Sequence, residues 1–237
     1  MKNKIDYLIT IFRNYSLLDI QRELFERYDS NEYRLVIVDN TPDSEKKHIT
    51  PKNNELILQR NSLNEFDGVS HGSAIDYGLE FIESEIVCIL DSDFFLFDRN
   101  INQYIINNIK AGYEAIGPEF GAKDFRDKHP GKFDDIPMVF CFFCKTEFAK
   151  KYTWKIEHHE LDFISSYVET GWRFRKHILE NKTKVLSWKI DNIESDSKQT
   201  YRNEDGKLVG MHYFAGSSAR IHHDFRGNLY ELYGQYI

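Results

Sequence analysis

The chain has 237 residues, 41% of them hydrophobic and 15% aromatic, which is enough apolar material for one sizeable core and excludes an intrinsically disordered protein. The formal net charge is −7 and the lysines and arginines form no block, which excludes the basic surface typical of nucleic-acid-binding proteins. We expect a single domain over residues 1–237.

The three cysteines are too few for a disulfide framework. Cys141 and Cys144 lie in an apolar run, without the second pair that a zinc site needs, so we expect plain buried thiols and a reducing compartment. No apolar window approaches the roughly 18 residues of a membrane span, and the N-terminus does not resemble a signal peptide. The sequence therefore favours a soluble, cytoplasmic protein without a transmembrane segment.

The first hundred residues alternate between strand and helix patterns. In chain order, we expect a strand at 7–12, a helix at 16–28, strands at 33–38 and 55–59, a helix at 73–82 and a strand at 86–90. Continuous apolar strands that are separated by helices indicate a mostly parallel central sheet covered on both faces. The predicted class is therefore α/β, of a Rossmann-like kind.

The second half of the chain has a less regular pattern. The sequence predicts a helix at 99–110, a strand at 138–143 and a helix or helix pair within 162–180. The polar stretch at 191–205 reads as a mobile loop. We therefore expect a regular first half and an irregular C-terminal half.

Acidic residues follow two of the predicted strands, Asp39 after the second and Asp91 after the strand at 86–90. In an open α/β sheet, ligands bind beyond the carboxyl ends of the strands. Asp91 and Asp93 point the same way from an extended backbone, whereas Ser92 points the other way. Two such carboxylates favour a divalent cation, and Mn²⁺ or Mg²⁺ takes phosphate oxygens as further ligands.

The alternative is that Asp91, Ser92 and Asp93 form a plain turn, since aspartate and serine are common turn residues. The apolar segments on both sides argue against it, because unpaired carboxylates inside a buried sheet are costly.

Four segments in this order resemble the GT-A fold glycosyltransferases, especially glycosyltransferase family 2. They are residues 9–14 (ITIFRN), 35–40 (LVIVDN), 61–78 with its glycines, and 86–93 (IVCILDSD). The resemblance implies a nucleotide-sugar-binding half at 1–100 and an acceptor-binding half at 101–237. It also implies that the nucleobase contacts Asp39 and that a metal ion binds Asp91 and Asp93. The full set of implied nucleotide contacts is Thr10, Phe12, Asp39, Asn61, Gly68, Asp91 and Ser92.

The resemblance further implies an inverting transfer from a nucleoside-diphosphate sugar to a hydroxyl of a carbohydrate, glycan or glycolipid acceptor. Such a transfer needs a carboxylate base. Residues 167–177 (YVETGWRFRKH) are similar to the family's acceptor segment and put Glu169 in the position of the base, with Asp162 and Glu160 as the next candidates. The alternative for Glu169 is a helix-terminal acid that only complements the helix dipole.

A late histidine often adds a metal ligand in related GT-A enzymes, and His212 is the candidate here. The cluster His222, His223 and Asp224 competes with it, and both groups could be surface histidines. Four aromatic residues are candidates for stacking on a sugar ring, although aromatic residues more often lie in the core: Trp154, Trp172, Tyr213 and Phe214.

Three other functions remain open from the sequence alone. A nucleotidyltransferase can use a related fold, but residues 9–14 lack the glycines that grip a triphosphate. A phosphatase with an aspartyl nucleophile usually carries its acidic pair after the first strand, not at mid-chain. A non-catalytic carbohydrate-binding subunit could retain the fold, because fold does not determine function.

Overall fold

The computed structural model of the protein describes residues 4–27, 32–60, 68–119, 136–156, 170–195 and 198–213. Its strands are β1 (Ile5–Ile11), β2 (Tyr33–Asp39), β3 (Glu55–Gln59), β4 (Ile86–Asp91), β5 (Phe94–Leu96), β6 (Ala115–Pro118), β7 (Cys141–Lys145), β8 (Val185–Ser195), β9 (Lys198–Arg202) and β10 (Leu208–Tyr213). Its helices are α1 (Tyr15–Phe25), α2 (Gly68–Leu79), α3 (Ile101–Lys110), α5 (Thr146–Ala149) and α7 (Trp172–Asn181), with a 3₁₀ turn at Asp43–Glu45.

Within the described residues the strands form one sheet in the order β3-β2-β1-β4-β7-β6-β8-β9-β10-β5. The first four of these are parallel, as the sequence predicts for continuous apolar strands between helices. In the pairing register Thr10 of β1 lies opposite Val38 of β2 on one side and Asp91 of β4 on the other. The α/β class and the helix-flanked central sheet, which is parallel over its first four strands, are therefore confirmed.

The expectation of a mobile loop at 191–205 is wrong, because most of this stretch is sheet. Strand β9 pairs antiparallel with both β8 and β10, so its backbone groups have partners on both sides. Two of its polar residues are buried rather than solvated: Gln199, which accepts a 2.9 Å hydrogen bond from the Tyr201 hydroxyl, and Thr200. Polarity alone is a poor guide here, since the strand pairs and buries its polar groups.

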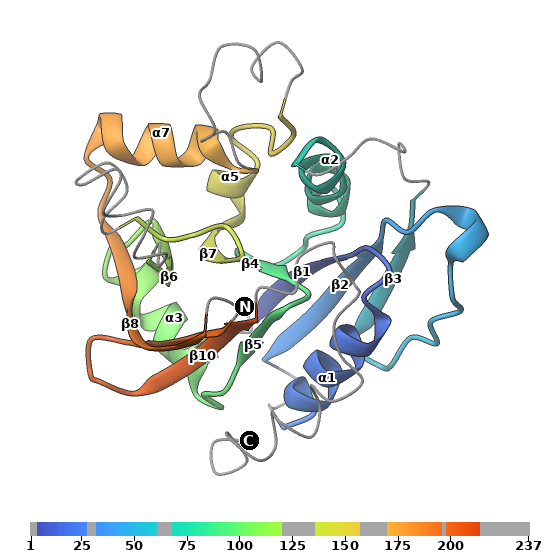
Figure 1. Ribbon diagram of the computed structural model, residues 1–237. Coiled ribbons are helices and arrows are strands. Elements are labelled where there is room, and N and C mark those ends of the chain that lie inside the picture. The colour runs from blue at the N-terminus through green and yellow to red at the C-terminus, as the bar shows by residue number, and fades with distance from the viewer. Residues whose placement is uncertain are drawn as a thin grey trace.

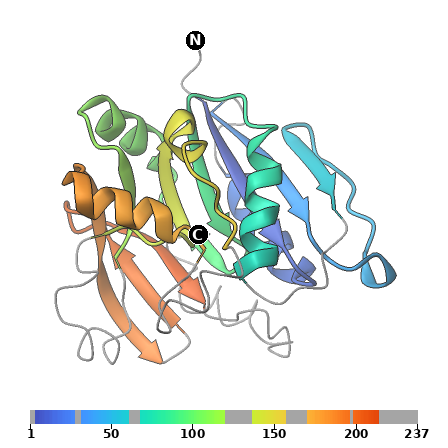
Figure 2. The ribbon, with the colours of Figure 1, turned by 90° about the horizontal axis from the view of Figure 1, so that it is seen from above.

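Helices cover both faces of the sheet, as Figures 1 and 2 show. Helices α2, α5 and α7 pack on one face, where Ile75, Phe148 and Phe174 join the apolar side chains of the strands. Helices α1 and α3 pack on the other face. No helix among the described residues is long and apolar enough to cross a membrane.

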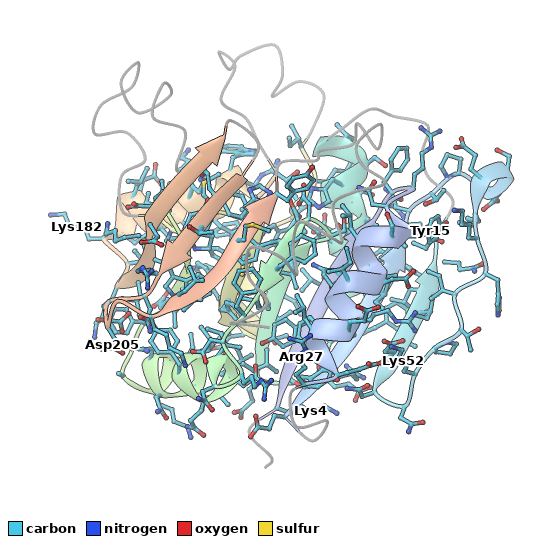
Figure 3. All side chains as sticks on the ribbon, turned by 60° about the horizontal axis from the view of Figure 1, so that its bottom comes forward. Lys4, Tyr15, Arg27, Lys52, Lys182 and Asp205 are labelled. Carbon is cyan, nitrogen blue, oxygen red and sulfur yellow. The ribbon has the colours of Figure 1, made fainter. Side chains whose placement is uncertain are left out.

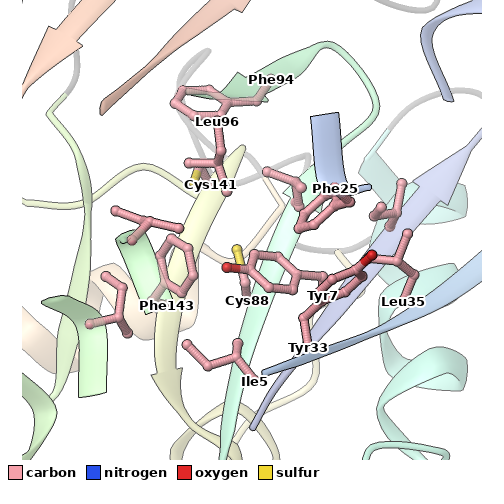
Figure 4. Close-up of a cluster of buried hydrophobic side chains, with 14 of the residues drawn as sticks. Ile5, Tyr7, Phe25, Tyr33, Leu35, Cys88, Phe94, Leu96, Cys141 and Phe143 are labelled. Atoms are coloured by element: carbon pink, nitrogen blue, oxygen red, sulfur yellow. The ribbon is translucent and has the colours of Figure 1, made fainter. Parts of the chain in front are cut away.

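The core beneath α1 and α3 is dense in aromatic rings (Figure 4). The ring of Tyr7 meets those of Phe25 and Phe143 edge-on, at centroid distances of 4.6 and 5.7 Å. The three cysteines are buried and free, as the sequence predicts for core thiols. Burial raises the pKa of the Cys144 thiol, which keeps that thiol protonated.

The carboxyl ends of β1, β2 and β4 lie at one edge of the sheet. There β1 leads to Tyr15 at the start of α1, and in Figure 3 Tyr15 lies at the opposite end of α1 from Arg27. In a parallel α/β sheet this edge is where ligands bind. The candidate site lies at this edge.

Candidate functional site

The triplet Asp91, Ser92 and Asp93 forms the connection between β4 and β5, which is the position expected for a ligand site. Asp91 is the last residue of β4 and is half-buried, whereas Ser92 and Asp93 are buried. The Asp91 amide donates a 2.9 Å hydrogen bond to the Phe140 carbonyl, which fixes the start of the turn.

Asp91, Asp93 and His212 come together at this turn, as the sequence predicts. One ligand atom from each lies within 4.8 Å of the others, and His212 Nε2 is 3.2 Å from Asp93 Oδ1. Two carboxylates and one imidazole nitrogen suit Mn²⁺, and the carboxylates also suit Mg²⁺. The donor set therefore fits the cation that the sequence implies.

Strand β10 carries His212 to the acidic turn. It pairs antiparallel with β5, which puts His212 opposite Phe94, and the Tyr213 amide donates to the Asp93 carbonyl at 2.9 Å. The His212 ring stacks on Phe140 with a centroid distance of 4.0 Å and an interplanar angle of 19°. Backbone pairing and ring stacking thus fix both the position and the plane of the imidazole.

His71 of α2 also lies at the candidate site, although the sequence predicts no role for it within the glycine-containing segment. Its Nε2 is 3.2 Å from Asp91 Oδ1. Burial lowers the pKa of His71, but contact with the Asp91 carboxylate and the charge of Asp93 raise it by more, so the net shift is upward. A protonated His71 offsets part of the negative charge of the acidic pair.

Gln21 of α1 is a second residue at the candidate site for which the sequence predicts no role. Its Nε2 donates to the carbonyls of Asp91 and Phe94, both at 2.8 Å. The signal available in the sequence was a lone polar residue on the apolar face of a predicted helix, between Leu17 and Leu24. Such a position is occupied by a polar residue only if the side chain finds a partner.

Asp39 lies at the carboxyl end of β2, and its side chain is wholly buried. Its Oδ2 accepts a hydrogen bond from the Tyr15 hydroxyl at 2.9 Å, and its Oδ1 accepts one from the Thr41 amide at 3.0 Å. The Tyr15 hydroxyl in turn accepts from the Lys47 amide at 3.0 Å. The structure therefore links Asp39 to a network that organises the loops after β1 and β2.

The other residues predicted to bind nucleotide are distributed around this edge. Thr10 is buried and lies opposite Asp91 in the sheet register, while Phe12 is partly exposed, with the Arg13 guanidinium 4.7 Å from its ring centroid. Gly68 begins α2. Asn61 lies outside the described residues.

Both candidate bases, Asp162 and Glu169, lie outside the described residues, as do Glu160 and Phe214. The competing cluster His222, His223 and Asp224 also lies outside them.

Two of the aromatic candidates for sugar stacking are core residues. Trp154 is wholly buried and stacks on Phe174 with a centroid distance of 4.3 Å, and Tyr213 is buried as well. Trp172 is partly buried.

The parallel strands β3-β2-β1-β4, the largely antiparallel remainder of the sheet and the acidic turn between β4 and β5 have the architecture of the GT-A fold. A solved structure with this fold is the mannosyltransferase PcManGT from Pyrobaculum calidifontis in complex with GDP-Man and Mn²⁺. It matches with a TM-score of 0.53 and 13% identity over 78% of this chain and 54% of that chain. The resemblance to a GT-A fold that the sequence indicates is therefore confirmed at the level of fold.

S. aureus TarS is a further similar structure. Its fragment 1–349 matches with a TM-score of 0.46 and 13% identity over 65% of this chain and 50% of that chain, and the same fragment in complex with UDP-GlcNAc gives 0.44. The chain thus spans about half the length of the solved structures it matches. No protein-family model and no curated protein matches the sequence.

Proposed function

We propose that the chain is a metal-dependent glycosyltransferase, which moves a sugar from a nucleoside-diphosphate sugar to an acceptor hydroxyl with inversion. The observation that carries the proposal is the convergence of Asp91, Asp93 and His212 at the carboxyl end of β4 in a GT-A fold. The presence of GDP-Man and Mn²⁺ in the P. calidifontis mannosyltransferase supports the same assignment.

In this proposal Asp91, Asp93 and His212 hold Mn²⁺ or Mg²⁺. The bound cation would supply positive charge to the leaving diphosphate. Asp93 and His212 are buried, so few waters compete with them for the ion, while half-buried Asp91 leaves the diphosphate a side from which to approach. His71 lies against Asp91 and adds a donor at the same edge.

The nucleotide would lie along the edge formed by the ends of β1, β2 and β4, against Thr10, Phe12, Asp39, Asn61, Gly68, Asp91 and Ser92. Both oxygens of Asp39 already accept hydrogen bonds from Tyr15 and Thr41. A contact of Asp39 with the nucleobase would therefore use a remaining lone pair of the carboxylate, and Tyr15 and Thr41 would fix the plane of that carboxylate.

Catalysis with inversion also needs a base for the acceptor hydroxyl, and Glu169 is our first candidate, followed by Asp162. We further propose one domain over 1–237, in which residues 1–100 bind the donor and 101–237 the carbohydrate, glycan or glycolipid acceptor. Three free, buried thiols support action in a reducing compartment such as the cytoplasm.

A thermal-shift panel tests donor binding directly, because a ligand that binds only the folded state raises the melting temperature. The panel contains UDP, GDP, UDP-GlcNAc and GDP-mannose, each with and without Mn²⁺. We expect at least one of them to raise the melting temperature only when Mn²⁺ is present. If none of the four raises the melting temperature in the presence of Mn²⁺, the proposed donor binding is wrong.

A further inference from the structure

Gln21 links helix α1 to both ends of the acidic turn. A single amide nitrogen donates to the Asp91 carbonyl, before Ser92, and to the Phe94 carbonyl, after Asp93, each at 2.8 Å. The two acceptors lie 70 and 73 residues away in the sequence. The amide therefore bridges the whole turn that carries the two carboxylates.

Burying the side chain of Gln21 costs free energy, because only its amide nitrogen finds hydrogen-bond partners among the described residues. The residue is 1% exposed, and its Oε1 accepts no hydrogen bond from the described residues. A buried acceptor without a partner destabilises the fold, so an apolar side chain would suit the helix face better if packing were the only requirement. What the glutamine adds is its pair of N–H donors.

Helix α1 is itself anchored to the strands that build the site. Leu17, Ile20 and Leu24 pack against Phe95 of β5 and Met211 of β10, and β10 also carries His212. The same helix therefore contacts the acidic turn through Gln21 and the histidine strand through its apolar side chains. This makes α1 a rigid support for all three candidate metal ligands.

We propose that Gln21 is a positioning residue, which fixes the backbone on both sides of Asp91–Asp93 and so sets the directions of the two carboxylates toward a cation. The inference deepens the proposed function and rests on it. Without the amide, the carbonyl oxygens of Asp91 and Phe94 lose the hydrogen-bond donor that they share. The carboxylates then sample more orientations, and binding a cation has to order them first.

The test compares Gln21→Met with Asn102→Leu. Methionine keeps the length and volume of glutamine but has no N–H group. Asn102 is a matched control, because it is also a buried helix amide, which accepts from the Tyr7 hydroxyl and donates to the Glu32 carbonyl at 3.2 Å. Tyr7 lies in the first half of β1 and Glu32 directly precedes β2. Both are therefore at the opposite end of the strands from the acidic turn.

Two measurements are made on the full-length protein. Calorimetric titration with Mn²⁺ should give a dissociation constant for Gln21→Met that is raised about tenfold or more, while Asn102→Leu keeps the wild-type value. Hydrogen exchange of the metal-free protein should show lost protection at residues 91–97 in Gln21→Met alone. If Gln21→Met does not fold, Gln21→Asn replaces it, because that amide is one methylene too short to reach both carbonyls.

Wild-type protection and wild-type Mn²⁺ affinity in Gln21→Met would overturn the inference, as would equal losses in Asn102→Leu. The two measurements also separate this inference from the proposed function. If the wild-type protein binds no Mn²⁺, the proposed metal centre is wrong. The exchange at 91–97 then still decides whether Gln21 orders the turn.

Discussion

Asp6 of β1 is a buried carboxylate whose charge is balanced by several donors at once. It accepts hydrogen bonds from the Arg34 guanidinium, from the Glu83 amide at 2.8 Å and from the Ser84 hydroxyl at 2.7 Å. Burial alone raises the pKa of Asp6, but the bonds from Arg34, Glu83 and Ser84 together lower it below its usual range. The ionised form therefore ties β1 to β2 and to the loop before β4.

A depressed pKa in the folded state stabilises the fold above the unfolded pKa, and this stabilisation is lost as the pH falls through the folded pKa. We expect Asp6→Asn to lower the free energy of unfolding by about 3 kcal/mol at pH 7, because it removes the buried charged partner of Arg34 and leaves only the exposed Glu83. The difference between wild type and variant should begin to shrink below about pH 4, where Asp6 of the unfolded chain becomes protonated, and should shrink further as the pH falls through the lower pKa of folded Asp6. Urea unfolding of both proteins at several pH values measures the difference in the free energy of unfolding. A difference that does not change with pH would contradict this account.

At the residue scale the sequence predicts the two acids and the histidine that come together at the candidate site, but not the residues that contact them. Asp91, Asp93 and His212 are identified because strand ends, acid spacing and family order all leave traces in the sequence. Gln21 shows only as a polar residue on the apolar face of a predicted helix, and neither its partners nor those of His71 can be predicted, since they depend on how closely α1 and α2 approach the turn. That approach is a product of tertiary packing.

At the scale of elements, the contact between β5 and β10 depends on a glycine. A Cβ at Gly210 would lie 2.6 Å from the Phe95 carbonyl oxygen and 2.8 Å from the Phe94 ring, closer than real side chains pack. Any larger residue therefore has to push β10 away from β5. His212 lies two residues further along the same strand.

We expect Gly210→Ala to weaken Mn²⁺ binding about tenfold through displacement of His212, and to cost about 1–3 kcal/mol of stability from overpacking. Calorimetric titration and urea unfolding measure the two effects. Gly206→Ala is the control: it strains a left-handed backbone, with φ +76°, but meets no atom within 4 Å. The account predicts that this control loses stability and keeps its Mn²⁺ affinity, so an equal loss of affinity in both variants would refute the role of β10.

Elements with a strong local signal are predicted well, and those that depend on distant pairing are not. The strands β1 to β4 and helices α1 and α2 follow from apolar periodicity within two or three residues of their observed ends, except that α2 starts earlier, at Gly68. Strands β8 and β9 were missed because their polar residues gain partners only when β9 lies between its neighbours. The short strand β5 was missed for the same reason, since it pairs with β10 from far along the chain.

At the scale of the whole molecule, the acidic turn lies where a parallel part and an antiparallel part of the one sheet meet. The parallel strands β3-β2-β1-β4 bring the turn to a ligand-binding edge, and the antiparallel strands β8-β9-β10-β5 bring His212 back to it. The sequence predicts the parallel part because βαβ order is local and right-handed crossovers leave few arrangements. It does not predict the return of β10, which depends on the whole second half of the chain.

The most direct test of the central claim is the release of nucleoside diphosphate from UDP-GlcNAc and GDP-mannose in saturating Mn²⁺, by wild type and by Asp93→Ala. Asp43→Ala, which removes an exposed acid paired with Lys46, is the control. The account predicts that wild type and the control turn over at least one donor, and that Asp93→Ala is slower by at least roughly 100-fold, with chelation by EDTA abolishing the wild-type rate. Wild-type turnover by Asp93→Ala under these conditions would contradict it.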